Sequence, residues 1–199
     1  SVSKILLDLT EAEEFIIFAN AEDLKKKTIA QDKFRSSLIT LEKNSACSFD
    51  SLIGSLNKYG FTRKDFVDEE GDYSVRGGII DLFSENMESP VRIEFFGDTI
   101  ESVREFDINS QRSVREVDSV KVGINLSSEE GRENFSDENI TDFFPEGLLL
   151  FVDEPEISLN LIDEIKISER ISGFKTVYIP AFANSSLTQS ESEIQFEAE

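Results

Sequence analysis

The sequence predicts an α+β fold, a curved antiparallel sheet with few helices, followed by part of an α/β lobe. Residues 72–124 contain successive strand patterns joined by short turns, which favours an antiparallel sheet. Residues 148–152 are an uninterrupted apolar run, which is typical of a strand buried in a parallel sheet. A helical pattern and another strand follow that run, so a β-α-β unit is expected there.

The negative charge of the chain is unevenly distributed. The 199 residues include 41 acidic and 20 basic side chains, a formal net charge of −21. Residues 1–126 carry a net charge of −8, and residues 127–199 carry −13. Because residues 125–131 have loop composition, we predict two domains. The first spans 1–126 with its core at 48–124, and the second spans 127–199 as a partial α/β lobe with an acidic tail.

Two helices and a strand are expected before the sheet core. Apolar side chains recur at helical spacing near the start of the chain: Val2, Ile5, Leu6 and Leu9. The apolar run 15–18 predicts a buried strand, and Asn20 is placed to cap a short helix that runs through Lys27.

A longer helix is predicted between Ser48, as its N-cap, and Gly60, at the position where helices often end on glycine. Its apolar stripe predicts packing against a sheet: Phe49, Leu52, Ile53, Leu56 and Tyr59.

The sheet segment is built from strand patterns and tight turns. Residues 90–96 alternate, which places Arg92, Glu94 and Phe96 on the face opposite Phe95. Gly97 and Asp98 form the kind of two-residue turn that closes a hairpin. The expected strands are residues 73–83 with a glycine pair inside, 90–96, 99–106 and, after a loop at 107–112, 117–124.

The second segment predicts a short helix from Ser136 and then the β-α-β run. The expected elements are a strand at 148–152, a helix at 157–171 and a strand at 176–179. Residues 185–199 are polar and acidic, as in a terminal tail.

The composition excludes several classes of chemistry. The chain has no histidine, which excludes a Ser-His-Asp or Cys-His pair, and Cys47 alone makes neither an internal disulfide nor a CxxC zinc site. The net charge of −21 argues against broad contact with nucleic acid. No apolar run is long enough to span a membrane, no signal peptide is visible, and a cytoplasmic location is expected.

Acidic residues at two places suggest chemistry that the rest of the chain does not support. Asp153 and Glu154 follow a buried strand, as in the second motif of nucleotide-hydrolysing enzymes. That motif needs a GxxxxGK[ST] loop, and no glycines in the chain have this spacing. The cluster at 68–70 lacks the pattern of a calcium loop and is interpreted as a solvated loop. No cofactor or metal is expected.

A small set of arginines is the more informative feature. Arg76 precedes the glycine pair at 77–78, where neighbouring bulk is missing, and Arg92 shares a strand face with Glu94 and Phe96. Arginine and aromatic side chains together are frequent anchors of protein interfaces. We therefore expect an exposed recognition face in the sheet segment, which contains Arg63, Arg76, Arg92 and Arg104.

Residues 48–124 contain several linked motifs, which are YGFTRKDFV at 59–67, GDYSVRGGIIDLF at 71–83, PVRIEFFGDTIESVREFD at 90–107 and SQRS at 110–113. Together they resemble the UvrA-interacting domain shared by UvrB and the bacterial transcription-repair coupling factors. Residues 136–157 resemble the return of the chain into the first UvrB-like lobe. The glycine pair and the absent phosphate loop favour the coupling factor over UvrB.

The resemblance implies an adaptor without catalytic activity, a fragment of a coupling factor that binds UvrA and recruits excision repair to stalled RNA polymerase. In the full-length parent, an ATP-dependent DNA translocase, RNA polymerase and DNA are further implied partners. The family's contact residues map onto Arg63, Arg76, Arg92, Glu94 and Phe95. Phe96 is the other candidate aromatic, since alternation sets Phe95 apart from Arg92 unless a bulge reorients it.

Two points stay open at this stage. UvrB-like members have a further arginine where this chain has Ser74, which puts one salt bridge with the partner in doubt. The alternative function is a fragment of a UvrB-type excision-repair ATPase, whose second motif would work only with a phosphate loop elsewhere in the parent chain.

Overall fold

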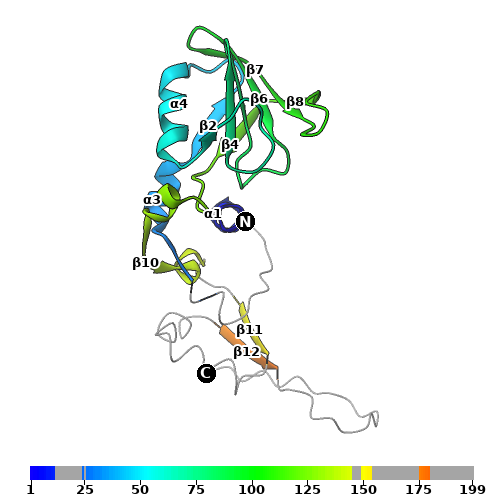
Figure 1. Ribbon diagram of the computed structural model, residues 1–199. Coiled ribbons are helices and arrows are strands. Elements are labelled where there is room, and N and C mark those ends of the chain that lie inside the picture. Colours follow the sequence, from blue (N-terminus) through cyan, green and yellow to red (C-terminus); the bar gives the residue numbers. More distant parts are fainter. Residues whose placement is uncertain (12–23, 25, 145–148, 154–174, 180–199) are drawn as a thin grey trace, which may run out of the picture. The chain divides into compact units, whose positions relative to one another are not determined.

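The computed structural model describes residues 1–11, 24, 26–144, 149–153 and 175–179, and these fall in two compact units (Figure 1). The first unit comprises Ser1–Phe15 and Lys27–Asn139, and the second comprises Ile16–Lys26 and Ile140–Glu199. Each unit is described by itself. The first extends past residue 126, and the domain boundary predicted there stays a prediction.

A six-stranded sheet dominates the first unit. Its strands lie in the order in which they occur in the chain, and all neighbours are antiparallel except the short parallel pair β3–β4. This confirms the predicted α+β class with a mostly antiparallel sheet. The strands are β3 (Thr62–Arg63), β4 (Asp72–Arg76), β5 (Ile79–Leu82), β6 (Val91–Phe96), β7 (Thr99–Phe106) and β8 (Ser113–Val117).

Helix α4 (Phe49–Lys58) covers one face of this sheet and closes the core (Figure 1). It begins as predicted, since the Ser48 hydroxyl accepts a hydrogen bond from the Ser51 N–H at 3.4 Å. It is followed by Gly60 at φ +76°, a left-handed conformation that suits glycine. Leu52 and Leu56 are buried in a core made mainly of side chains from the covered sheet face: Tyr73, Ile80, Leu82, Val91, Ile93, Ile100 and Val103.

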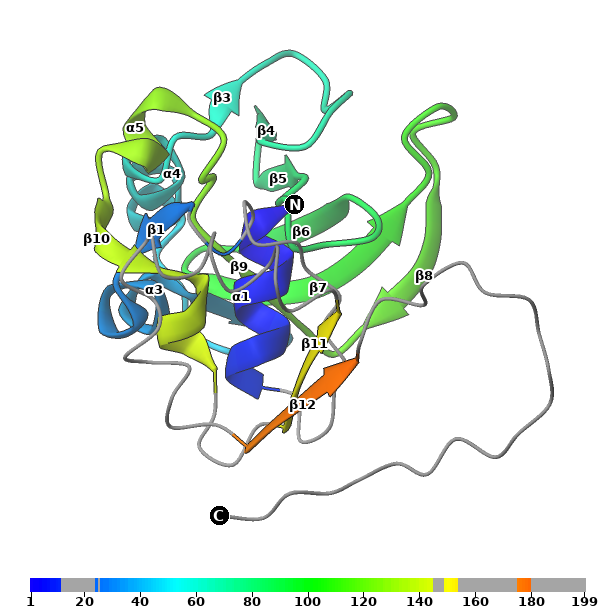
Figure 2. The same cartoon turned by 90° about the horizontal axis from the view of Figure 1, so that it is seen from below.

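Smaller elements surround the sheet. Strand β2 (Ile39–Glu42) pairs with β9 (Ser119–Val122), and β1 (Lys27–Ile29) pairs with β10 (Phe135–Asn139), both antiparallel. Helix α1 (Val2–Glu11) lies beside β9 (Figure 2), where Glu11 pairs with Lys121. The Ser3 hydroxyl donates to the carbonyl of Ile124, just after β9, at 3.3 Å. Short helices α3 (Gln31–Ser37) and α5 (Glu129–Arg132) complete the unit.

A β-bulge interrupts the β6–β7 hairpin. Glu94 pairs with Ser102, whereas the next residue, Phe95, pairs with Ile100, so Glu101 is the extra residue. The bulge puts Ile100 in the core and Ser102 on the opposite side, although the two residues are two positions apart. Alternation along β6 itself continues unbroken from Val91.

Some predicted elements were wrong. Lys27 begins strand β1 and does not end a helix, and Ser136 lies in strand β10 and does not start a helix. Strand β9 lies within the strand predicted at 117–124, whereas strand β8, which ends at Val117, was not predicted. The predictions for 15–18, Asn20, 145–147, 157–171 and 185–199 lie outside the described residues.

The second unit contains a parallel strand pair, as predicted. Strand β11 (Leu149–Asp153) pairs in parallel with β12 (Lys175–Ile179), with Leu149 opposite Lys175 and Asp153 opposite Ile179. A 3-10 turn at Ile140–Phe143 precedes them. Among the described residues of both units, no helix is long and apolar enough to cross a membrane.

Candidate functional site: a polar sheet face

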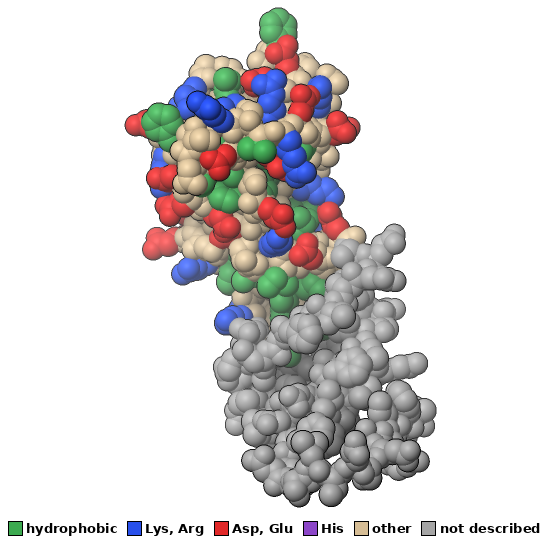
Figure 3. Space-filling view, turned by 90° about the vertical axis from the view of Figure 1, so that its right-hand side faces the viewer, with side chains coloured by type: hydrophobic (Ala, Val, Ile, Leu, Met, Phe, Trp, Pro, Cys, Tyr) green, Lys and Arg blue, Asp and Glu red, His purple; other side chains and the backbone are tan. Residues whose placement is uncertain are grey.

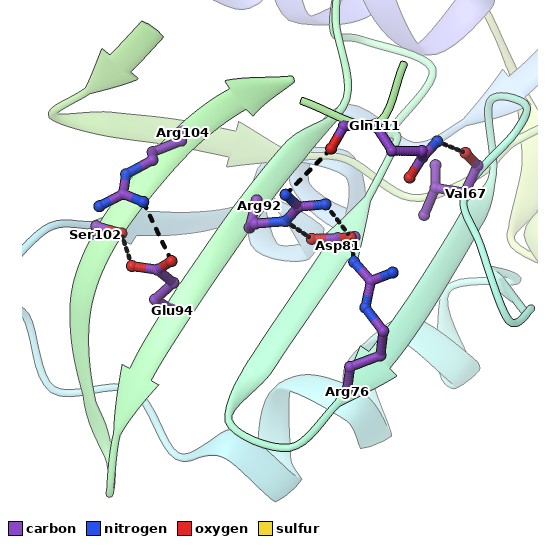
Figure 4. A network of polar contacts seen from close by, with 8 residues as sticks. All are labelled: Val67, Arg76, Asp81, Arg92, Glu94, Ser102, Arg104 and Gln111. Atoms are coloured by element: carbon purple, nitrogen blue, oxygen red, sulfur yellow. Dashed lines mark hydrogen bonds and ion pairs between the residues drawn. The ribbon is translucent and has the colours of Figure 1, made fainter. Parts of the chain in front are cut away.

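The sheet face turned away from α4 carries a row of charged side chains. Tyr73 faces α4, where its hydroxyl donates to Asn57 Oδ1 at 2.7 Å. Because side chains alternate along a strand, Ser74 and Arg76, one and three positions further on, project from the other side of the sheet. The cross-strand partners of these residues on β5, β6 and β7 project from the same side of the sheet. We call it the polar sheet face: Ser74, Arg76, Asp81, Arg92, Glu94, Ser102 and Arg104. Figure 4 shows all of these residues except Ser74.

Asp81 is the centre of the polar sheet face. Its carboxylate is 1% exposed and lies directly opposite Arg92 on the neighbouring strand. Arg92 binds it in bidentate fashion, from Nε at 2.7 Å and Nη2 at 2.9 Å, and Arg76 donates to it from Nη2. One buried carboxylate therefore fixes two of the predicted partner-binding arginines.

Arg92 is the more enclosed of the two arginines. Its side chain is 16% exposed, and its guanidinium lies 4.9 Å from the centre of the Phe106 ring. The hydrogen bonds that Arg92 donates to Asp81 raise the pKa of Arg92 above its ordinary value. Arg92 Nη1 also donates to the Gln111 carbonyl at 3.4 Å. These contacts hold the guanidinium in one orientation on the sheet.

Gln111 joins two loops at the edge of this face. It adopts φ +57°, and its Nε2 donates to the carbonyls of Val67 at 3.1 Å and Ile108 at 2.7 Å. Loop 107–112 is tightened by Asp107, which accepts from the Ser110 N–H at 2.8 Å, and this hydrogen bond lowers the pKa of Asp107. The loop at 107–112, which contacts Arg92, is thus tied to the loop between β3 and β4.

A second ion pair lies further along the same face. Arg104 Nη1 is 3.2 Å from Glu94 Oε1, and the Ser102 hydroxyl donates to Glu94 Oε2 at 2.7 Å. Both charged side chains remain about a third exposed. The exterior of the unit shows the same mixture of signs: in Figure 3 acidic and basic side chains are interspersed over the face turned to the viewer.

Two of the predicted contact residues do not lie on the polar sheet face. Arg63 pairs in register with Tyr73, so its side chain projects from the same sheet face as Tyr73, the face that α4 covers. Phe95 packs against Phe49 of α4, with ring centres 5.1 Å apart in an edge-to-face arrangement. The bulge does not bring Phe95 across the sheet, and Phe96, at 76% exposed, is the accessible aromatic of β6.

Ser74 is a small buried residue beside Asp81. It is 1% exposed, and its Oγ has no hydrogen-bond partner within the part of the chain that the structure describes. Ser74 pairs with Asp81 across β4 and β5. Asp81 accepts its side-chain hydrogen bonds from Arg76 and Arg92, and not from Ser74.

The loop between β3 and β4 is held by one lysine and three carboxylates. Lys64 Nζ lies 3.0 Å from Asp68, 2.8 Å from Glu69 and 3.1 Å from Asp72. The hydrogen bond with Glu69 is the largest of the effects that raise the pKa of Lys64. The carboxylates lie within 4.8 Å of one another, as metal ligands would. The Lys64 ammonium group offsets one of the three negative charges and contacts all three carboxylates, so the cluster holds the loop together.

Sequence reasoning did not select Asp81, Gln111 or Phe66, although all three hold or border the predicted arginines. For Asp81 a signal existed: the tight turn at the glycine pair sets the β4–β5 register and puts Asp81 on the side of Ser74. For Gln111 no such signal existed, because its contacts join segments 44 residues apart.

Comparison with known proteins finds similarity over the segment that contains this site. A family model described as "UvrB interaction domain" matches residues 39–125, which include the whole polar sheet face. Curated relatives named transcription-repair-coupling factor include those of Mycobacterium tuberculosis (41% identical over 80 residues, 40% of this chain) and Bacillus subtilis (32% over 115 residues, 58%). The Escherichia coli relative is 30% identical over 117 residues, 59% of this chain.

The matched segments are small parts of those relatives, between 6% and 10% of their length. The three relatives have the same name, transcription-repair-coupling factor. The chain is therefore similar to the UvrB interaction domain over residues 39–125 and to a segment of the transcription-repair-coupling factors.

Proposed function

We propose that this chain is a non-catalytic docking segment of a transcription-repair coupling factor and that its polar sheet face binds UvrA. The observation that carries the proposal is the trio Arg76, Asp81 and Arg92, which lies inside the matched domain. The trio has two positive charges and one negative, so it presents a net positive charge in a chain of −21. In the parent protein, such docking would bring excision repair to a stalled RNA polymerase.

The geometry suits recognition of carboxylates. Asp81 holds Arg76 and Arg92 in place before a partner arrives, which lowers the ordering cost of binding. Arg76 keeps 40% of its side chain exposed and uses one N–H group on Asp81, so its other donors are available to a partner. Phe96 supplies an exposed aromatic at the end of β6.

Titration of UvrA with the 199-residue chain tests the proposal. We expect saturable binding and, for Arg76→Ala, an affinity at least about tenfold lower, which corresponds to about 1.4 kcal/mol. The fold should survive this substitution, because Asp81 retains its bidentate partner Arg92.

Arg115→Ala is the matched control. Arg115 also pairs with a carboxylate, that of Glu105 at 2.6 Å, but its side chain is 67% exposed and lies outside the polar sheet face. Its loss should leave the affinity within about twofold of wild type, since exposed pairs contribute little. Absence of binding by the wild type, or equal losses for the two arginine variants, would overturn the proposal.

The alternative, a segment of a UvrB-type ATPase, retains one structural observation. Strand β11 is parallel to β12 and ends at Asp153, as a strand carrying a second nucleotide-hydrolysis motif would. That motif requires a phosphate loop, so ATP hydrolysis by the parent protein that depends on Asp153 would favour the alternative. Hydrolysis unchanged by Asp153→Asn would count against it.

A further inference from the structure

Phe66 is an exposed aromatic that borders the polar sheet face. It lies in the loop between β3 and β4 and is 59% exposed, whereas its neighbour Val67 is fully buried. A single exposed apolar side chain is ordinary on a protein surface. The surroundings of Phe66 therefore decide whether it has a role.

The loop holds Phe66 in a fixed position from both sides. On one side, Lys64 pairs with Asp72, whose Oδ2 also accepts the N–H groups of Asp68 at 3.3 Å and Glu69 at 3.1 Å. On the other side, the Val67 carbonyl accepts from Gln111, as Figure 4 shows. Phe66 is thus exposed on an anchored stretch of backbone, and a partner that binds it has little ordering to impose.

Phe66 is also paired with one of the predicted contact arginines. The Arg76 guanidinium lies 5.6 Å from the centre of the Phe66 ring, within the range of a cation–π contact. Arg76 is held at the same time by Asp81, so the ring and the cation keep a fixed relation. Two groups from separate segments therefore form one composite surface with an apolar part and a cationic part.

We infer that Phe66 and Arg76 form a single anchor for the partner proposed above, with the ring in an apolar recess of UvrA and the guanidinium on a carboxylate at its rim. The inference rests on the proposed function and extends it to a residue outside the set predicted from sequence. Charge complementarity defines the occupant, because the free donors of Arg76 pair with an acid and the exposed ring of Phe66 excludes water from that pair.

Titration of UvrA with Phe66→Ala and Phe66→Leu variants of the 199-residue chain tests the inference. Truncation to alanine should weaken binding by about tenfold, as is usual for an aromatic anchor. Leucine retains apolar contact but has no ring for Arg76, so its loss should be intermediate. Both variants should unfold at nearly the wild-type temperature, because Phe66 is mostly outside the core.

Ile5→Ala is the matched control, since Ile5 is a 43% exposed apolar residue on α1, away from the polar sheet face. Its affinity should equal that of the wild type. If Arg76→Ala weakens binding and Phe66→Ala does not, the anchor is overturned and the proposed function stands. If the wild type does not bind UvrA, the proposed function fails and the anchor fails with it.

Discussion

Asp81 shows how one side chain determines the properties of the polar sheet face. Two arginines share its buried carboxylate, and the more enclosed of them, Arg92, has no other acidic partner within hydrogen-bonding distance among the described residues. Removal of one partner from a buried ion pair leaves an uncompensated charge, which is the costly part of such a change. In the proposed docking, Asp81 therefore acts through the arginines that it positions.

Replacement of Asp81 by asparagine should destabilise the fold by about 3 kcal/mol, because it retains the shape of the side chain but removes the charge that Arg92 needs. Urea unfolding measures the loss. Glu88→Gln is the control, since Glu88 pairs with Lys4 at 3.1 Å but is 86% exposed, and its loss should stay below about 1 kcal/mol. Similar losses for the two variants would contradict the central role of Asp81.

At this scale the sequence predicted the arginines and missed what holds them. Arg76, Arg92 and Glu94 do lie on one face, because strand alternation is a local property. Arg63 and Phe95 were grouped with them by resemblance, and the sheet places both on the other side. That separation follows from alternation together with the pairing of β3 and β4, which is a tertiary property.

Among the elements, α4 is followed by a turn that depends on glycine, whereas a glycine inside the helix has no such role. Gly60 has φ +76°, and a Cβ there would lie 1.9 Å from the Ser128 hydroxyl oxygen. Gly54 lies in the helix interior, and a Cβ there would meet nothing within 4 Å. The same substitution should therefore have opposite effects at the two positions.

Gly54→Ala should stabilise the protein by up to about 1 kcal/mol, since alanine favours the helix interior. Gly60→Ala should destabilise it by more than about 1 kcal/mol, through backbone strain and the clash with Ser128. Thermal unfolding of the two variants beside wild type gives both signs in one experiment. A rise in unfolding temperature for both variants would contradict the strain assigned to Gly60, and a fall for both would contradict the gain expected at Gly54.

The accuracy of the element predictions followed the locality of their signals. The cap, apolar stripe and closing glycine of α4 are local, and the helix formed as predicted. Strand β10 reads Phe-Ser-Asp-Glu-Asn, which locally suggests a capped helix start, but its pairing with β1 more than a hundred residues away makes it a strand. Strand β8 is almost wholly exposed and therefore lacks the alternation that identifies a strand.

For the whole molecule, the distribution of charge matters more than its sum. Several basic side chains, among them Lys4, Lys43 and Arg115, pair with carboxylates at the surface. The net charge of the chain is −21. The long-range field of the chain is thus negative, while the polar sheet face is locally positive. A phosphate backbone would meet the field first, and a protein partner with one well-placed carboxylate would use the local charge.

We therefore expect no retention of duplex DNA by the chain in a gel-shift assay at about 0.15 M salt, even at protein concentrations of about 100 µM. The same preparation should bind UvrA, which shows that it is folded. Retention at low micromolar concentration, abolished by Arg76→Ala, would mean that the polar sheet face contacts phosphate and would contradict the division of charge described above.

The extra residue in the β6–β7 hairpin also affects which changes of length the chain can accept. Glu101 lies between Ile100, which faces the core, and Ser102, which faces Glu94. Its deletion would leave those two neighbours correctly oriented in a continuous ladder. The tip of the hairpin, with the exposed Phe96, can accordingly change by one residue without moving Arg104 to the wrong side of the sheet.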